Sequence, residues 1–121
     1  MTLKKIDFNE DLILDTGATF NSVKNKSLLA GVYVANNKIQ MCTNTGERIL
    51  EKHGVLLGMD NNPWLDENSM ANIISFGELV KQYRVMYDST VEDCFFCHTQ
   101  TGVVQFGRTE EGLYSISLPE G

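Results

Sequence analysis

The residues best suited to chemistry in this 121-residue chain are Asp15-Thr16-Gly17-Ala18-Thr19, which follow the apolar run Leu12-Ile13-Leu14. The apolar run predicts a buried strand, and Asp, Thr and Gly are common residues of tight turns. The pattern therefore predicts that a strand delivers the Asp15 carboxylate to a turn at its end. A carboxylate held there can act as a general acid or base.

The residues after Asp15 fit the same interpretation. Thr16 offers a hydroxyl that would tie two neighbouring loops together, and Ala18 keeps the floor of a cleft small. Gly17 adds no Cβ and tolerates positive φ, so a second loop can approach it closely. An ordinary turn is the alternative interpretation, because a five-residue match is weak evidence on its own.

Water activation by such a motif requires two carboxylates that face each other, as in aspartic proteases. Two carboxylates about 3 Å apart cannot both ionise, so the pair holds one proton. The ionised member takes a proton from water, and the protonated member polarises the scissile carbonyl. The motif occurs once, and 121 residues suit one domain and not the two lobes of a pepsin-like monomer. The sequence therefore predicts a homodimer in which each copy contributes its Asp15.

The elements expected to position this loop are mainly β-strands, in short apolar runs separated by Asn, Gly and Asp. The hairpin turns are predicted at Asn36-Asn37 and Thr99–Gly102, and Met59–Ser69 is predicted to be a polar loop. Ser75-Phe76-Gly77-Glu78 has the spacing of a capping box and predicts one short helix that continues to Gln82. The expected strands are Leu3–Phe8, Leu12–Asp15, Gly31–Ala35, Lys38–Cys42, Arg48–Leu57, Tyr83–Tyr87, Cys94–Thr99, Val103–Phe106 and Leu113–Leu118.

Residues Met41–Leu50 predict a hairpin whose tip contains Asn44, Thr45 and Gly46. In a protease this hairpin would be the flap that closes over a peptide. A surface hairpin without function is the alternative. The order along the chain favours the flap, because the catalytic loop, the hairpin, the apolar strand Ala71–Ile74 and the short helix follow one another.

Composition excludes several classes of partner. A formal charge of −6 and a pI near 4.8 argue against nucleic-acid binding by this segment. The sequence has no apolar run of about 18 residues and no hydrophobic signal core near its start, so an intracellular, cytoplasmic protein without a membrane span is expected. Three cysteines, an odd number, favour reduced thiols over a disulfide framework.

The segment Cys94-Phe95-Phe96-Cys97-His98 matches the Cys-x-x-Cys-His pattern of covalent haem attachment. Haem would need a secretory route and an opposite axial ligand, so it is not expected here. The same residues could supply three zinc ligands, with Cys42 or His53 as a fourth, but no second spaced pair supports zinc. Adjacent strand residues point to opposite faces, so Cys97 and His98 do not form a nucleophile and base. No metal and no cofactor are predicted, and the cysteines are expected in the core or an interface.

Three segments together resemble the protease of copia-type LTR retrotransposon polyproteins, namely Asp15–Thr19, Ala71–Leu79 and Tyr83–Ser89. Gly107–Ile116 also resembles the segment that joins that protease to integrase, so the similarity covers the chain from about Leu12 to Ile116. Retroviral relatives usually place Gly where this chain has Ser75, whereas copia-type proteases often carry Ser there.

The resemblance implies one retropepsin-like aspartic protease domain over residues 1–121, with about 100–121 resembling the start of the connecting segment. It implies a mainly β fold with one short helix, whose active site is completed by a two-fold homodimer. Asp15 would be catalytic, Thr16, Gly17 and Ala18 would form the active-site loop, and Asn44–Gly46 would form the substrate flap.

The implied activity is cleavage of the element's own Gag-Pol polyprotein, in the cytoplasm or within virus-like particles. Such proteases normally lie in a long polyprotein, so a 121-residue chain is expected to be an excised domain, a truncated gene model or a host-captured remnant. A remnant would be a catalytically inactive dimerisation or peptide-binding module.

Overall fold

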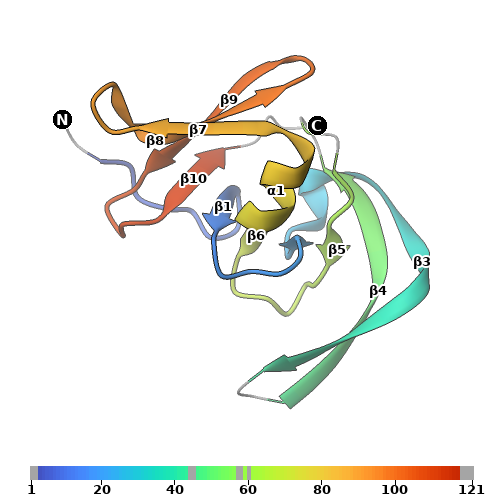
Figure 1. Cartoon of the computed structure of the whole chain (residues 1–121). Helices are drawn as coiled ribbons and strands as arrows, with labels where there is room; N and C mark the ends of the chain where they lie inside the picture. The colour runs from blue at the N-terminus through green and yellow to red at the C-terminus, as the bar shows by residue number, and fades with distance from the viewer. Residues whose placement is uncertain (1–2, 44–45, 57–58, 60, 118–121) are drawn as a thin grey trace.

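A computed structural model describes residues 3–43, 46–56, 59 and 61–117. The described strands form a single open sheet in the order β3-β4-β5-β2-β6-β1-β10-β9-β8-β7 (Figure 1). The predicted mainly β class with one short α-helix is confirmed. In chain order the elements are β1 (Asp11–Asp15), β2 (Ser22–Val23), a 3₁₀ turn (Lys26–Leu28), β3 (Leu29–Thr43), β4 (Gly46–Leu56), β5 (Trp64–Leu65), β6 (Asn72–Ser75), α1 (Phe76–Gln82), β7 (Arg84–Asp88), β8 (Glu92–Thr99), β9 (Gly102–Arg108) and β10 (Tyr114–Ser117).

Strand β1 is an interior strand that is buried on both faces. It pairs in parallel with β6 on one side and antiparallel with β10 on the other. Leu12 and Leu14 face the main hydrophobic core, whereas Ile13 packs with Ile6 and Ala71 in a smaller cluster. Burial of both faces explains why β1 is a continuous apolar run and not an alternating pattern.

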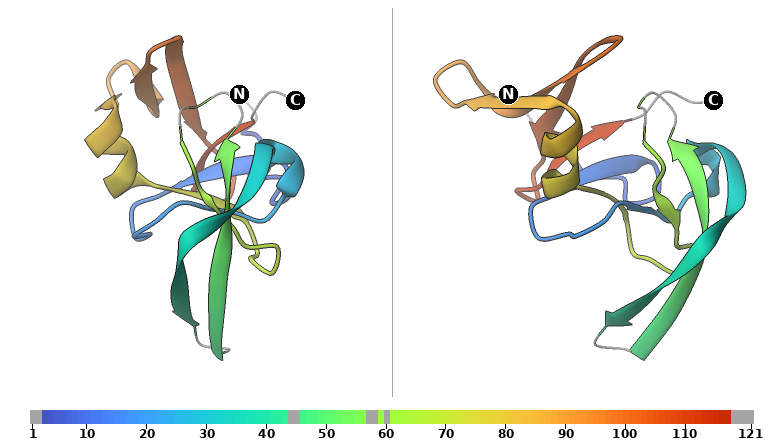
Figure 2. Two further views of the ribbon diagram at one scale, coloured as in Figure 1. Left: turned by 90° about the vertical axis from the view of Figure 1, so that its right-hand side faces the viewer. Right: turned by 45° about the vertical axis from the view of Figure 1, so that its right-hand side comes forward.

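The hairpin of β3 and β4 extends away from the rest of the sheet (Figures 1 and 2). The predicted turn at Asn36-Asn37 is wrong, because both residues lie within β3. Pairing with β4 shifts between Val34 and Ile39, which accommodates the two asparagines in a bulge. No glycine is present to favour a tight turn there, and the β-prone residues on either side continue to pair. Thr43 pairs with Gly46, and Asn44 and Thr45 lie outside the described residues.

Other sequence-based strand predictions differ from the structure at the chain's polar segments. The predicted strand Leu3–Phe8 is wrong, since only Lys4 forms a single parallel bridge, to Thr109. Asp7 instead opens a turn, in which its backbone carbonyl accepts N–H bonds from residues 10 and 11. The predicted loop Met59–Ser69 contains β5, and β2 was also missed, because a two-residue strand carries no periodicity. The predicted turn at Thr99–Gly102 is confirmed.

Strands β7, β8 and β9 form a three-stranded part of the sheet with two unlike faces. Cys97 and Phe106 lie in the main core, whereas Met86, Phe96 and Val103 lie on the opposite face. Cys94 and Cys97 are both buried, and burial raises the pKa of each thiol. Cys42 is exposed.

The described residues contain no group of three or more His, Cys, Asp or Glu side chains arranged to hold a metal ion. Within the same part of the chain, no helix is long and apolar enough to cross a membrane.

A buried carboxylate joins the N-terminal segment to the last strand. The Asp11 side chain accepts hydrogen bonds from the Asp7 N–H at 2.9 Å, the Ser117 hydroxyl at 2.7 Å and Lys4 Nζ at 3.1 Å. Burial alone would raise the pKa of Asp11, but the bonds from Asp7, Ser117 and Lys4 outweigh it and hold that pKa below its ordinary value. The ionised carboxylate is therefore part of the folded structure.

The lowered pKa predicts an acid-dependent loss of stability. A carboxyl whose pKa falls on folding stabilises the protein above its unfolded pKa, and that contribution is lost as pH falls through the folded pKa. Asp11→Asn is expected to cost about 1–3 kcal/mol near neutral pH, with a smaller difference below about pH 4. Urea unfolding between pH 3 and 7 measures this, with exposed Glu67→Gln as the control. A cost that does not vary with pH would contradict the prediction.

Gly54 allows the close approach of β4 to the start of β3. A Cβ at Gly54 would lie 2.5 Å from the Gly31 carbonyl oxygen and 2.6 Å from Leu29 Cδ1. Gly54→Ala is therefore expected to destabilise the fold by about 1–3 kcal/mol through overpacking. Gly31→Ala is the matched control, because its Cβ would meet no atom within 4 Å. Thermal or urea unfolding measures both variants, and equal costs would contradict this account.

Candidate functional site

Asp15 lies at the carboxyl end of β1, beside Ser75 at the corresponding end of β6. Its side chain is half-buried, and Oδ1 accepts a hydrogen bond from the Gly17 N–H at 2.8 Å. The predicted strand followed by a carboxylate-bearing turn is confirmed. Gly17 does not adopt the positive φ allowed for in the sequence analysis, because the Asp15 side chain itself closes the turn. A Cβ at Gly17 would lie 3.4 Å from Asp15 Oδ1, so the protomer alone does not require glycine there.

Ser75 fixes the loop that follows Asp15. Its hydroxyl donates to the Ala18 carbonyl at 2.8 Å and accepts from the Glu78 N–H at 3.2 Å. The second bond caps α1, as the sequence predicted. The Ser75 N–H donates to Asn21 Oδ1 at 2.6 Å. One residue therefore ties both the middle and the end of the loop to the start of α1.

Asn21 extends this network to a third segment. Its Nδ2 donates to Asn61 Oδ1 at 3.0 Å, and its carbonyl accepts the Trp64 N–H at 3.0 Å. Sequence reasoning missed Asn21, because asparagine is common in loops and nothing in its spacing distinguishes it. The loop containing Thr16, Gly17 and Ala18 is thus anchored at its carboxyl end, while Thr16 and Gly17 are exposed.

Asn72, the first residue of β6, performs a similar role. Sequence reasoning missed this residue too. Its fully buried amide oxygen accepts the N–H groups of Lys24 and Asn25 at 2.9 and 3.1 Å. Its Nδ2 donates to the carbonyls of Asn9 and Asp11 at 2.9 and 3.1 Å. The signal in the sequence is a polar residue within the apolar run of β6, which indicates a satisfied buried amide.

A mostly apolar hollow of about 460 Å³ adjoins Asp15. Asp15 is the one charged side chain among the residues that line it. A carboxylate beside an apolar surface can bind a neutral, partly apolar substrate and exchange protons with it. The lining residues are Phe8, Ile13, Leu14, Asp15, Thr16, Ala71, Ile73, Phe95, Gly112, Leu113 and Tyr114.

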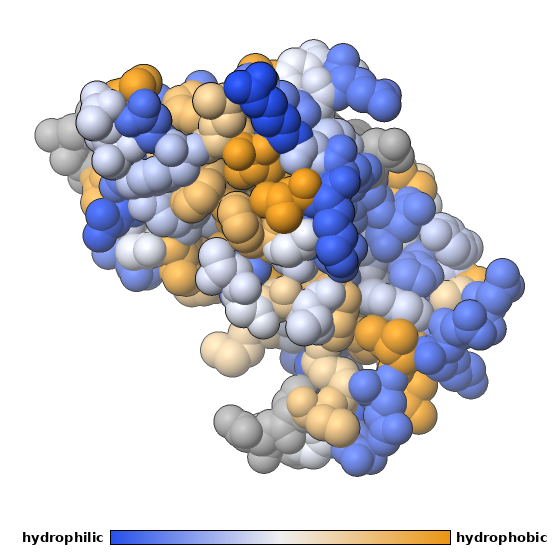
Figure 3. Space-filling view, viewed as in Figure 1, coloured by the Kyte–Doolittle hydropathy of each residue, from blue (hydrophilic) through white to orange (hydrophobic). Residues whose placement is uncertain are grey.

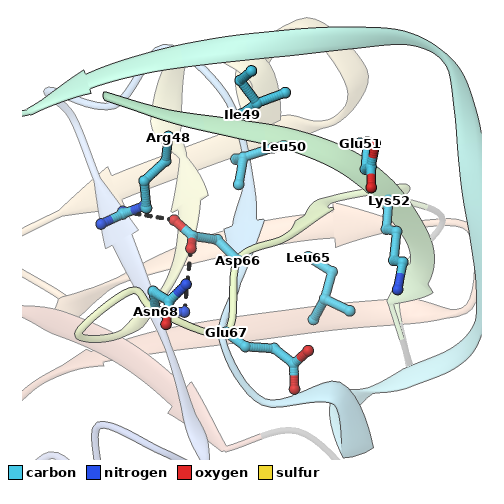
Figure 4. A pocket seen from close by; sticks show the side chains of 9 residues that line it. All are labelled: Arg48, Ile49, Leu50, Glu51, Lys52, Leu65, Asp66, Glu67 and Asn68. Carbon is cyan, nitrogen blue, oxygen red and sulfur yellow. Dashed lines mark hydrogen bonds and ion pairs between the residues drawn. The ribbon is translucent and has the colours of Figure 1, made fainter. Parts of the chain in front are cut away.

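The predicted flap corresponds to the β3–β4 hairpin, in which β4 pairs with β5, and side-chain contacts at two places also join the hairpin to the segment that contains β5. Near its outer end, Arg48 Nη2 pairs with the buried Asp66 carboxylate at 2.8 Å (Figure 4). Both residues line a second hollow, of about 330 Å³. Gly46 begins β4 with φ of 130° and does not line the hollow beside Asp15.

The second attachment is an aromatic stack at the inner part of the hairpin. The His53 ring lies 3.8 Å from Trp64 and 5.7 Å from Tyr33, measured between ring centroids. His53 Nδ1 also lies 3.1 Å from the Asn62 carbonyl oxygen. Trp64 therefore contacts the hairpin itself.

Comparison with protein-family models, with curated proteins and with solved structures finds no match for this chain.

The Ser75 network predicts a measurable contribution to stability. Ser75→Ala removes the helix cap and leaves the Ala18 carbonyl without its donor, so a loss of about 1–2 kcal/mol is expected. Ser89→Ala, at an exposed position, should change stability by less than about 0.5 kcal/mol. Urea unfolding monitored by circular dichroism compares the two. Equal effects would show that the network contributes nothing.

Proposed function

We propose that this chain is an aspartic endopeptidase of a copia-type LTR retrotransposon, active as a homodimer with a retropepsin-like fold. The observation that carries the proposal is the placement of Asp15, at the end of a buried strand, in a hydrogen-bonded turn, and as the one charged residue lining a mostly apolar hollow. The order of loop, hairpin, strand and helix also supports it.

In this proposal the Asp15 carboxylates of two copies share one proton. The ionised carboxylate removes a proton from water as the oxygen attacks the scissile carbonyl carbon, and the protonated one donates to the carbonyl oxygen. Collapse of the tetrahedral intermediate breaks the C–N bond, and the leaving amine takes up a proton. The chemistry uses no metal and no cofactor.

The other residues have supporting roles in the same proposal. Ser75 and Asn21 hold the loop that carries Asp15 in one position, which lowers the cost of placing two loops against each other. The β3–β4 hairpin would cover a bound polypeptide and exclude water. The substrate would be the Gag-Pol polyprotein of the element, cleaved in the cytoplasm or in virus-like particles.

Cleavage of a diverse peptide pool near pH 5 tests the activity. The parent chain should cut, and Asp15→Asn should lower the rate by at least about 10²-fold, since it removes the acid and base. The variant should still fold, because an asparagine oxygen can accept the Gly17 N–H as Asp15 does. Asp88→Asn, a control at the exposed end of β7, should retain activity.

Persistent cleavage by Asp15→Asn would overturn the proposal. Absence of cleavage by a folded parent dimer would favour the alternative, a captured remnant that acts as a dimerisation or peptide-binding module.

A further inference from the structure

A carboxylate on β8 joins side chains from three other strands. Asp93 Oδ1 accepts hydrogen bonds from the Tyr114 hydroxyl at 2.6 Å and from the Tyr87 hydroxyl at 2.7 Å. Asp93 Oδ2 accepts a third bond, from Arg108 Nη1 at 3.2 Å. The donors come from β10, β7 and β9, which are neighbours of β8 or of one another in the sheet. We call these four residues the Asp93 cluster.

The Asp93 cluster reaches the candidate site through Tyr114. Tyr114 lies directly opposite Leu14 in the pairing of β10 with β1, and Leu14 precedes Asp15 in the chain. The Tyr114 ring also meets the Phe95 ring edge to face, with 4.9 Å between the ring centroids. Phe95 and Tyr114 both line the hollow beside Asp15. Tyr114 therefore belongs both to an exposed hydrogen-bonded cluster and to the wall of the site.

Two kinds of contact hold the rings of this wall. Phe95 and Tyr114 are partly buried against the main hydrophobic core, and Phe76 of α1 contacts Phe95 with 5.8 Å between ring centroids. In Figure 3 apolar side chains gather around α1, bordered by polar ones. The Tyr114 hydroxyl is held by Asp93 and not by the core. A ring held by packing at its base and by a hydrogen bond at its far end is fixed in angle as well as in place.

We propose that Asp93 is a positioning residue for the reaction: it fixes the Tyr114 ring, and through that ring Phe95, as the wall of the hollow beside Asp15. This inference rests on the proposed function, because it concerns the site at which a polypeptide would be cleaved. Asp93 does not line the hollow, so it acts only through the residues it holds. Reacting groups keep a productive geometry when the side chains around them are locked by packing and by supporting hydrogen bonds.

The tyrosine bonds of the Asp93 cluster carry this role more than its ion pair does. The bonds from Tyr114 and Tyr87, followed by the contact with Arg108, hold the pKa of Asp93 below its ordinary value. The carboxylate is therefore ionised at about pH 5 and accepts from both hydroxyls at once. The pair with Arg108 is exposed, at 52% for the arginine and 43% for the aspartate side chain, so it contributes little.

Steady-state cleavage of a peptide substrate by the whole chain tests the inference. Asp93→Ala should raise KM by at least about threefold and change kcat by less than about twofold, because the wall loosens while Asp15 is untouched. Asp93→Asn should restore the parental KM, since an amide oxygen accepts both hydroxyls. Asp88→Ala is the matched control: this exposed carboxylate accepts bonds from Thr90 in its own turn and lines the hollow on the opposite face. It should leave KM unchanged.

A double-mutant cycle shows whether Asp93 acts through Tyr114. Tyr114→Phe keeps the ring and removes the hydroxyl that Asp93 holds. If the wall is positioned by that bond, Asp93→Ala should change KM little further in the Tyr114→Phe background. Unfolding curves establish that each variant is folded. A full Asp93→Ala effect in that background would overturn the inference.

A binding measurement separates this inference from the proposed activity. N-acetylphenylalaninamide is titrated into chain with ¹³C-labelled Phe and Tyr rings, and the Phe95 and Tyr114 ring resonances are followed. Asp93→Ala should weaken binding by at least about threefold in Kd, and Asp88→Ala should not. Binding that depends on Asp93, with no cleavage of any peptide, supports the positioned wall and removes the proposed function. Cleavage and binding unchanged by Asp93→Ala do the reverse, and a folded parent that neither cuts nor binds overturns both.

Discussion

The parallel pairing of β1 with β6 is the constraint on which the rest of the structure depends. Its register places Asp15 opposite Ser75, at the point where both strands end. Because the strands end together, one serine can cap α1 and hold the loop after Asp15 at once. A one-residue slip would turn Leu12 and Leu14 away from the main core and put Ile13 in their place, so the two different clusters on the two faces of β1 fix the register.

The side-chain amides of Asn21 and Asn72 link the paired strands to neighbouring irregular segments. Asn21 connects the loop after Asp15 to the segment before β5, and Asn72 connects β6 to the N-terminal segment and to the residues after β2. Each amide satisfies backbone groups that no regular ladder could reach. Side-chain hydrogen bonds therefore anchor the irregular segments around the site to the strands.

Sequence reasoning succeeded where residue type alone determines the local structure. A continuous apolar run predicted β1, a capping box predicted α1, and a glycine-containing turn predicted the connection of β8 to β9. Sequence reasoning failed where the local structure depends on which strands pair with each other. Asn36-Asn37 resembles a turn in isolation, but β4 continues to pair beyond it, and the two-residue strands exist only because their neighbours hold them. The roles of Asn21 and Asn72 likewise arise from segments distant in sequence. The second carboxylate that the proposed chemistry requires would have to come from a second copy of the chain.

The bulge at Asn36-Asn37 has a consequence for how the molecule behaves among its copies. β3 is 15 residues long and lies at one edge of the sheet. A long, regular edge offers a row of unpaired backbone donors and acceptors to any passing strand, which is how edge-to-edge aggregation begins. The bulge interrupts that row and twists the strand in the middle, and Lys38 adds a charge beside it. The chain can thus project a long hairpin into solvent without presenting a continuous template for strand addition.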